Sequence, residues 1–414
     1  MKKILPWLIL GILIRLVITP ITLHPDIRGY NLGAYLISQG HVFNFYDYLG
    51  NLPENDQLVN IYGRDLFIYP PLAYLYPAVF LKLLWPLYPQ ELFQTLLIDM
   101  WKTIEHPQFS LLVYLLKLPY LIPDLLIVYL LGKFFKNNRE KFLAQIFWLL
   151  NPVVIYTTYM ISQFDVLLAL SIIASLLLAK NKKFFYATIA LALGAAVKQF
   201  VFLLLPILAI YTPGSFKKKI GVLLTGLGIY VLILLPYLSS VGFRRYALMA
   251  SQTDKIFFAK IPISGAAFLP IFLIGLFFIY WLCINFKGKF SLWQWFIWPM
   301  LLFYSVVHFH PQWFTWFTPL LVIFLVKLGR KAALPVVFMI LAYLGIVLMF
   351  EPSLNTGIFS PLNPPWGQDY SLIPPLTKLF PEFTLRSILF SLLAASAAAI
   401  AFLTYKKPDE SLHK

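Results

Sequence analysis

Long apolar runs recur from one end of this sequence to the other. Each is close to the length that an α-helix needs to cross about 30 Å of hydrocarbon. Of the 414 residues, 60% are hydrophobic and 12% are charged, which is not the composition of a soluble domain. We therefore expect an all-α polytopic membrane protein with about twelve transmembrane helices, at residues 4–21, 110–131, 142–160, 165–180, 184–197, 200–212, 219–238, 266–285, 290–307, 313–328, 332–350 and 384–404.

The distribution of charge predicts the orientation of these helices. With twelve crossings, one side of the membrane receives twenty of the 33 basic residues but only Glu140, Asp409 and Glu410 of the 17 acidic ones. Loops rich in lysine and arginine stay in the cytoplasm, so both termini are predicted to be cytoplasmic. These basic residues are Lys2, Lys3, Lys133, Lys136, Arg139, Lys141, Lys180, Lys182, Lys183, Lys217, Lys218, Lys219, Lys287, Lys289, Lys327, Arg330, Lys331, Lys406, Lys407 and Lys414.

The same reasoning accounts for the formal net charge of +16 without nucleic acid as a partner. Short basic cytoplasmic loops set orientation and contact anionic membrane lipids. The first apolar run follows Lys2 and Lys3 and has no small-residue cleavage site after it, which indicates a retained signal anchor. We expect an integral protein of a membrane such as the bacterial plasma membrane.

The segment from Tyr69 to Tyr88 is apolar but is not expected to cross the membrane, because a thirteenth span would reverse the side of most lysine clusters. It is predicted to be an amphipathic or re-entrant helix at the outer interface. Five prolines are expected to break it, namely Pro70, Pro71, Pro77, Pro86 and Pro89.

The chain is expected to consist of two modules. An N-terminal module, residues 1–238, contains the first outer loop at 22–109 with its short interfacial helices. A C-terminal module, residues 239–414, contains outer loops at 239–265 and 351–383. Because the cytoplasmic loops are short and basic, any chemistry is predicted on the extracytoplasmic side.

Ionisable residues near the outer ends of the spans are the candidate functional residues, since burying a charge in a membrane is costly unless it is paired or faces a cavity. Asp26 either acts as a general base or caps the helix that starts after it, and Asp165 either caps a span or enters the pocket. Lys117 and Asp124 lie seven residues apart on one helix face. They are either separately satisfied or form a stripe that faces the pocket.

Basic residues on the outer side are candidates for binding an anion. Lys198, next to Gln199, either snorkels or contacts an anion. Arg244 and Arg245 lie in an outer loop, against the positive-inside trend. His308 and His310 are two residues apart with no third ligand nearby, so hydrogen bonding to phosphate or sugar is preferred over a metal site.

Several alternatives are excluded by missing patterns. The sequence has neither a Walker A loop nor a glycine-rich dinucleotide fingerprint, and its single cysteine, Cys283, cannot form an internal disulfide. An ATP pump and a cytosolic nucleotide-sugar enzyme are therefore not expected.

The order of the remaining motifs resembles that of the GT-C glycosyltransferases, which transfer sugar from a polyprenyl or dolichyl phosphate carrier. The resemblance depends on an early aspartate in a long first outer loop and on four short motifs that follow it, and it leaves about 80 C-terminal residues unassigned. These positions are Asp26, YPPLAY at 69–74 beginning with Tyr69, Gln163-Phe164-Asp165, Lys198-Gln199 and His308-Phe309-His310-Pro311-Gln312.

This resemblance implies an inverting hexosyltransferase, with mannose or another hexose as the sugar. Asp26 is implied as the base that deprotonates an acceptor hydroxyl on a lipid, glycan or protein. Lys198, Arg244, Arg245, His308 and His310 are implied to stabilise the leaving phosphate. Tyr69, Lys117, Asp124, Gln163, Asp165 and Gln199 are the remaining expected pocket residues.

No cofactor is expected, and a requirement for a divalent metal ion is left open. The first loop opens with one aspartate rather than an Asp-Asp or Asp-Glu pair, which departs from metal-dependent oligosaccharyl transfer. Two other functions remain as alternatives. A transporter or flippase for a lipid-linked sugar would have broken helices near the bilayer centre, and a surface-polysaccharide ligase would have its large outer loop late in the chain.

Overall fold

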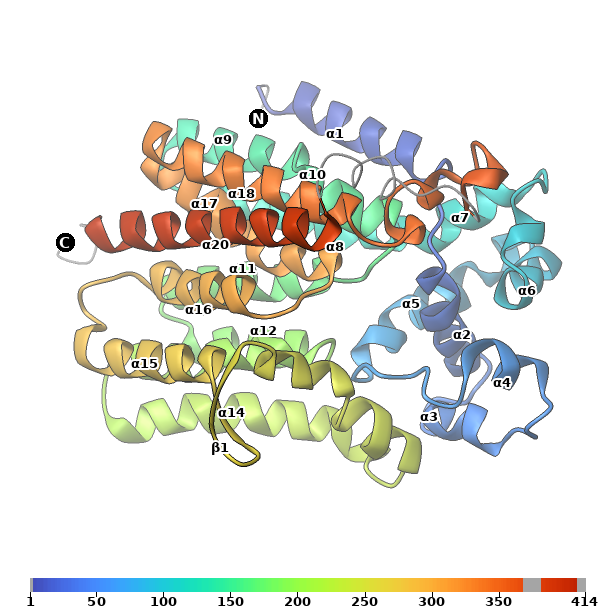
Figure 1. The fold of residues 1–414 in the computed structure, drawn as a ribbon, viewed down its shortest axis with the longest axis horizontal. Coiled ribbons are helices and arrows are strands. Elements are labelled where there is room, and N and C mark those ends of the chain that lie inside the picture. Colours follow the sequence, from blue (N-terminus) through green and yellow to red (C-terminus); the bar gives the residue numbers. More distant parts are fainter. Residues whose placement is uncertain (1–2, 368–380, 408–414) are drawn as a thin grey trace.

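The computed structural model describes residues 3–367 and 381–407 and is built almost entirely of helices (Figure 1). A bundle of roughly parallel and antiparallel helices fills most of the molecule, and shorter helices gather at one end of it. Lys2, Asp409, Glu410, Lys414 and residues 368–380 of the outer loop at 351–383 lie outside the described residues.

Every predicted span overlaps a helical segment of this bundle, although residues 267–270 of the span predicted at 266–285 form a strand. The bundle helices are α1 (Leu5–Ile18), α7 (Phe109–Lys117), α8 (Leu121–Phe134), α9 (Asn138–Leu149), α10 (Pro152–Val154), α11 (Val166–Lys180), α12 (Phe184–Ala195), α13 (Leu205–Tyr211), α14 (Phe216–Leu234), α15 (Ile271–Phe286), α16 (Leu292–Val306), α17 (Phe314–Leu328), α18 (Arg330–Leu348) and α20 (Glu382–Lys406). Helix α11 packs against α8, α12 and α17 and therefore lies at the centre of the bundle.

Six continuous stretches among the described residues are long and apolar enough to cross a membrane. They are Phe109–Phe134, Asn138–Met160, Phe216–Tyr237, Pro311–Leu328, Arg330–Leu348 and Glu382–Lys406. They establish the predicted class, an all-α membrane protein. Several other predicted spans form shorter apolar helices, such as Leu5–Ile18 and Ile271–Phe286. The number of crossings and the side of each terminus stay predictions.

Polar side chains in the short loops define where several helices begin. The Ser215 side chain accepts a hydrogen bond from the backbone amide of Lys218 at the start of α14. Ser291 and Gln294 form a capping box at the start of α16. These caps satisfy amides that would otherwise lack a partner at the helix ends.

The predicted first outer loop folds into a cluster of short helices at one end of the bundle (Figure 1). These are α2 (Asp26–Ser38), α3 (Phe45–Tyr48), α4 (Gln57–Tyr62), α5 (Leu72–Leu84) and α6 (Gln90–Ile98). Helices α2 and α5 make the most extensive contact in this cluster. We call the cluster, residues 22–108, the end domain.

Helix α5 corrects one prediction, because its interior proline does not break it. Pro77 lies inside the continuous helix Leu72–Leu84, whereas Pro71 is at the N-cap, where no amide is needed. A proline removes one helical hydrogen bond, but Tyr74 and Leu81, on the turns before and after it, are buried and hold the helix in place. On the other side, Val79 and Leu83 are exposed.

A small antiparallel hairpin interrupts the helical pattern between α14 and α15. It consists of β1 (Lys260–Ser264) and β2 (Ala267–Pro270), joined by a turn in which Gly265 has a φ of +52°. Pro262 and Gly265 disfavour a helix here, and Gly adopts positive φ without a steric penalty. The sequence prediction of an all-α fold did not include this hairpin.

Candidate functional site

A cavity of about 450 Å³ lies where the end domain meets the bundle. Its walls come from the start of α2, from the segment before α5, and from the loops before α11, before α17 and after α18. The polar residues that line it are His24, Asp26, Arg28, Tyr30, Tyr62, Tyr69, Tyr74, Gln163, His310, Gln312, Glu351 and Ser353. We call it the polar cavity.

Asp26 is the first residue of α2, and its carboxylate opens into the polar cavity. The N-cap position is Pro25, and no side chain caps this helix, so the alternative that Asp26 is the cap is not what the structure shows. The side chain is 54% exposed and accepts a hydrogen bond of 2.9 Å from the amide nitrogen of Gln163. Gln163 therefore orients a carboxylate that keeps free acceptor sites.

His24 borders Asp26 but does not neutralise it. Its Nδ1 accepts a 3.2 Å hydrogen bond from the backbone amide of Asp26, so this nitrogen carries no proton. Burial lowers the pKa of His24, which favours the neutral ring. The 3.8 Å approach of Nδ1 to the Asp26 carboxylate is consequently not an ion pair.

Lys198 is held by a buried carboxylate behind the polar cavity. Its Nζ lies 2.7 and 2.8 Å from the two oxygens of Asp165, and the indole N–H of Trp316 donates to the same carboxylate. The rings of Tyr69 and Phe164 lie 4.9 and 4.7 Å from Nζ. Lys198 does not snorkel, and the Asp165 side chain does not cap α11.

A second cavity of about 210 Å³ lies next to the first and shares Ile68 and Tyr69 with it. Its lining is mainly apolar and includes Phe200, Leu203, Ile256, Phe303, Trp313 and Trp316, together with Lys198, Gln199 and Lys255. We call it the apolar cavity. The side-chain amide of Gln199 lies 3.4 Å from the carbonyls of Ala247 and Leu248.

A lysine and a histidine meet between the two cavities. Nζ of Lys255, in the apolar cavity, is hydrogen-bonded to Nε2 of His310, in the polar cavity. Burial lowers the pKa of His310 to about 4 and that of Lys255 to about 8. At neutral pH the histidine is therefore the neutral acceptor and the lysine is the cation.

Three charged residues at these cavities were not among the predicted site residues. They are Lys255, Arg28 and Glu351. The Nε of Arg28 is buried without a hydrogen-bond partner, and its guanidinium lies 5.7 Å from the Tyr62 ring. Two of them carried a signal: Arg28 follows Asp26 by two residues, and Glu351 directly follows a predicted span.

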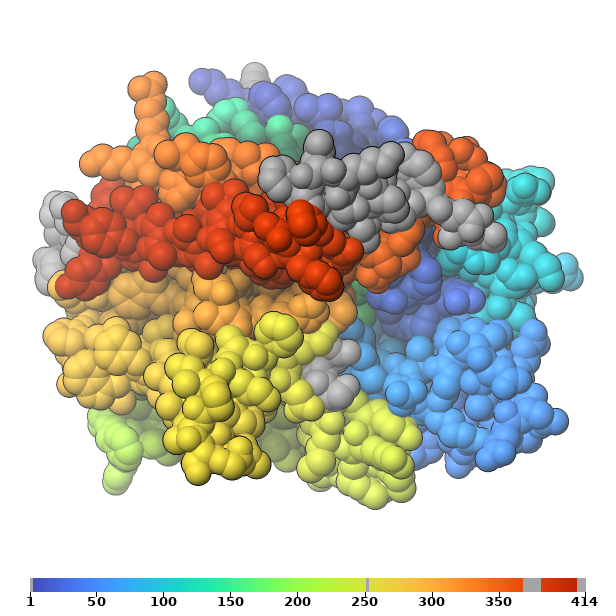
Figure 2. Space-filling view, viewed as in Figure 1, coloured from blue at the N-terminus to red at the C-terminus, as the bar shows by residue number. Residues whose placement is uncertain are grey.

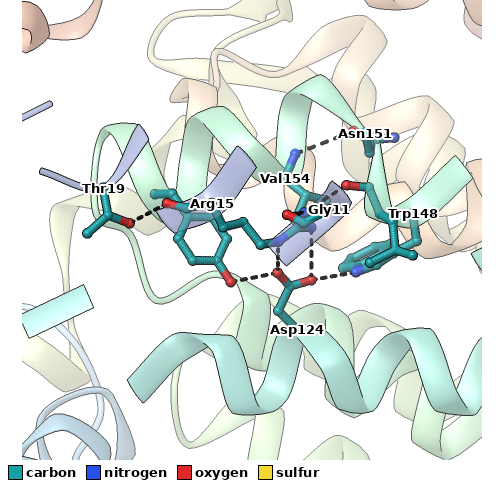
Figure 3. Close-up of polar contacts among 9 residues, drawn as sticks. Gly11, Arg15, Thr19, Asp124, Trp148, Asn151 and Val154 are labelled. Carbon is teal, nitrogen blue, oxygen red and sulfur yellow. Dashed lines mark hydrogen bonds and ion pairs between the residues drawn. The ribbon is translucent and has the colours of Figure 1, made fainter. Parts of the chain in front are cut away.

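Asp124 lies in a closed network inside the bundle rather than in a pocket, which corrects its predicted position (Figure 3). Its carboxylate is 2.5 Å from Nε of Arg15, and it accepts hydrogen bonds of 2.7 Å from the Trp148 indole and 2.6 Å from the Tyr159 hydroxyl. Arg15 also donates to the carbonyls of Gly11 and Leu149. The hydrogen-bonding groups of Arg15 and Asp124 are therefore bonded to other groups of the protein.

Lys117 is also enclosed, so its predicted position in the pocket is corrected in the same way. Its Nζ donates to the carbonyls of Thr19, Thr22 and Tyr159 at 3.0, 2.6 and 2.9 Å. Lys117 and Asp124 thus have separate partners, the first of the two alternatives left open by the sequence.

The predicted phosphate ligands are only partly brought together. His310 lines the polar cavity, whereas Arg244 and Arg245 are exposed and line neither cavity. Arg244 donates to the carbonyls of Leu238 and Ser239. His308 lies beside Phe258, with ring centroids 5.6 Å apart, and also lines neither cavity.

Among the described residues, no group of three His, Cys, Asp or Glu side chains is placed to hold a metal ion. Comparisons with protein-family models, with curated proteins and with solved structures found no match for this chain. The residues of the two cavities are therefore the features of this chain that bear on its function.

Proposed function

We propose that this protein is an inverting glycosyltransferase that moves one sugar from a polyprenyl-phosphate donor to an acceptor hydroxyl at the polar cavity. The observation that carries the proposal is the half-exposed carboxylate of Asp26, which accepts a hydrogen bond from Gln163 and faces the polar cavity. His310 lines the same cavity and is hydrogen-bonded to Lys255. This reaction requires an accessible general base and a nearby cation.

In the proposed reaction, the acceptor oxygen attacks the anomeric carbon of the sugar and Asp26 takes the hydroxyl proton. The bond between this carbon and the phosphate oxygen breaks on the opposite face, and the lipid phosphate leaves with the electron pair. The configuration at the anomeric carbon is inverted. A phosphate leaves without being protonated, so a second carboxylic acid is not required, unlike in glycoside hydrolysis.

The arrangement of the two cavities supports a division between the substrates. The polar cavity, with its carboxylates and amides, suits hydroxyl groups of the sugar and the acceptor. The apolar cavity suits the first isoprenoid units of the carrier, and Lys255 between them suits the phosphate. Lys198 shares its charge with Asp165, so its main contribution is to hold Tyr69, which lines both cavities, at their boundary.

The sugar side of the site is proposed to be extracytoplasmic. The end domain, which supplies Asp26 and Tyr69 to the polar cavity, lies at the end of the bundle opposite the end at which α20 terminates (Figure 1). Helix α11 starts near the cavity and ends at Lys180. The lysine-rich loop at 180–183 therefore lies at the end of α11 that is far from the cavity. Hexoses, mannose among them, are the proposed sugars, and membrane lipids the surrounding partners.

The proposal is tested by incubating purified protein with a panel of polyprenyl-phosphate hexoses and pentoses, with water and with added hydroxyl-bearing compounds as acceptors, and measuring the lipid phosphate released by hydrolysis or transfer. Parallel reactions with a chelator determine whether a divalent ion is needed. We expect release by the wild-type protein and by Glu54→Gln, an exposed control in the end domain, but not by Asp26→Asn. Donor binding without any release would favour a transporter instead, and wild-type release by Asp26→Asn would remove Asp26 from the mechanism.

A further inference from the structure

The hairpin formed by β1 and β2 presents large apolar side chains to the outside of the molecule. Ile261, Ile263 and Leu269 are 53%, 60% and 42% exposed. Ile261 is paired directly with Leu269, so the two side chains lie on the same face of the hairpin. Figure 2 shows residues of this region, in yellow, standing forward on the surface of the molecule.

A hairpin of this kind is not stable in water without support. Isolated two-stranded hairpins are marginal at best, and each Å² of apolar surface left in water costs about 25 cal/mol relative to burial. The residues of β1 are exposed throughout its length. The hairpin therefore needs lipid or another apolar surface to cover its apolar face.

The neighbouring helices indicate what covers this face. Helix α15 begins at Ile271, directly after β2, and carries exposed Phe277 and Trp281. Helix α14, on the other side of the segment, is apolar enough to cross a membrane and exposes Leu232. The exposed apolar side chains of the hairpin thus lie between two apolar helices that also expose large apolar side chains.

Basic and aromatic residues accompany the apolar ones. Arg244, Arg245 and Lys260 are exposed, and Asp254 is the one acidic residue between positions 241 and 269. Nζ of Lys260 lies 4.6 Å from the centre of the Phe268 ring. Basic groups beside exposed aromatic and aliphatic side chains are typical of segments that lie at the headgroup level of a bilayer.

We propose that residues 241–269 form a membrane-docking segment that lies in the interface of the outer leaflet. Ile261, Ile263 and Leu269 enter the boundary between headgroups and acyl chains, and Arg245 and Lys260 contact the phosphates of anionic lipids. The charge favours a lipid surface over an apolar protein partner.

The docking segment has a second role in the fold, because it supplies Ala247, Ala250, Lys255 and Ile256 to the wall of the apolar cavity. Anchoring the segment in the bilayer interface would hold this wall against the lipid from which a lipid-linked ligand arrives. The membrane placement itself does not depend on the proposed transferase activity.

The single cysteine of the chain makes the placement measurable. Cys283 is buried in α15. In a Cys283→Ser background, Ile263→Cys and Leu269→Cys are labelled with a nitroxide and the protein is reconstituted into vesicles of phosphatidylcholine and phosphatidylglycerol. Asn55→Cys, exposed in the end domain, is the control for a position in water. The accessibility of each label to oxygen, which partitions into lipid, and to a water-soluble nickel chelate is then compared.

We expect the ratio of oxygen to nickel accessibility at positions 263 and 269 to exceed that at position 55 several-fold. A ratio equal to that at position 55 would place the hairpin in water, and low accessibility to both reagents would place it against protein. Either result overturns the proposal.

A charge-removing variant tests the lipid contact separately. Arg245→Gln combined with Lys260→Gln should move the label at position 263 toward water in vesicles that contain phosphatidylglycerol, and should not move it in phosphatidylcholine alone. If the label at position 263 lies at the same depth in both kinds of vesicle when Arg245 and Lys260 are retained, the proposed contact with anionic lipid is wrong.

Discussion

Asp124, in the bundle, and Asp26, in the end domain, are two carboxylates in opposite situations. Asp124 is fully buried, and Arg15, Trp148 and Tyr159 occupy its oxygens. Asp26 is half-exposed in the polar cavity, with Gln163 as its side-chain donor. A carboxylate whose acceptor sites are all used by the protein stabilises the fold, whereas one that keeps free sites in a cavity is available for a substrate.

Asp165 lies between these two extremes. Its ion pair with Lys198 is buried, as for Asp124, yet Lys198 and Trp316 line the apolar cavity. It therefore connects the interior of the bundle to the site without presenting a free carboxylate. The comparison predicts that removing the charge of Asp26 affects turnover and that removing the charge of Asp124 affects folding.

The largest expected effect is on turnover in Asp26→Asn. Loss of a general base typically costs about 10²- to 10⁴-fold in rate, so kcat for sugar transfer should fall by that factor. The thermal unfolding midpoint should stay near that of the wild type, since the carboxylate is half-exposed and does not cap α2. Transfer kinetics and thermal unfolding in detergent measure the two quantities.

The complementary variant, Asp124→Asn, should unfold easily. It leaves Arg15 buried without its counter-charge, and breaking a buried ion pair costs about 3–5 kcal/mol. The unfolding midpoint should fall sharply, while kcat per folded molecule stays close to that of the wild type.

A double variant provides the control for this prediction. Arg15→Met with Asp124→Leu removes both charges and should recover much of the stability, because no buried charge is left unpaired. If Asp124→Asn instead lost activity at unchanged stability, the structural role of this network would be wrong.

The third effect is on donor binding and depends on pH. Lys255→Gln should raise the apparent donor KM by roughly ten- to hundredfold, as expected for a lost charge-assisted hydrogen bond. Because burial lowers the pKa of Lys255 to about 8, its ammonium is present below that pH and is lost as the pH rises through it. Wild-type donor affinity should therefore weaken above about pH 8.

His310 should not add to this dependence, since its pKa of about 4 keeps it neutral from pH 5 upward. Titration of donor KM between pH 6 and 9.5 in wild type and Lys255→Gln gives the comparison. The variant should show a flat profile above pH 7. A wild-type profile retained in Lys255→Gln would assign the titration to a different group.

The smallest expected effect belongs to Gln163→Leu, which removes the donor that orients Asp26. Because solvent can replace this hydrogen bond at a half-exposed carboxylate, we expect only about a three- to tenfold loss in kcat. The donor KM should not change, and this separates a positioning role from phosphate binding. A loss as large as that of Asp26→Asn would mean that Gln163 contacts the substrate directly.

Particular residues show how far the sequence reasoning reached. Asp26, Gln163, Tyr69 and His310 were predicted as site residues, and all four line the polar cavity. Lys117 and Asp124 were predicted there too, but they are enclosed in the bundle. Arg15 is the one charged residue in the first apolar run, and it was the sequence signal that Asp124 had a buried partner.

The sequence alone determined the helices, because an apolar run longer than four turns can satisfy its backbone in lipid only as a helix. The tertiary structure decided which charges meet, since Arg15 and Asp124 are 109 residues apart and Lys198 and Asp165 are 33 apart. Whether a buried charge finds a protein partner or a cavity depends on how helices distant in sequence pack, and no local pattern encodes that.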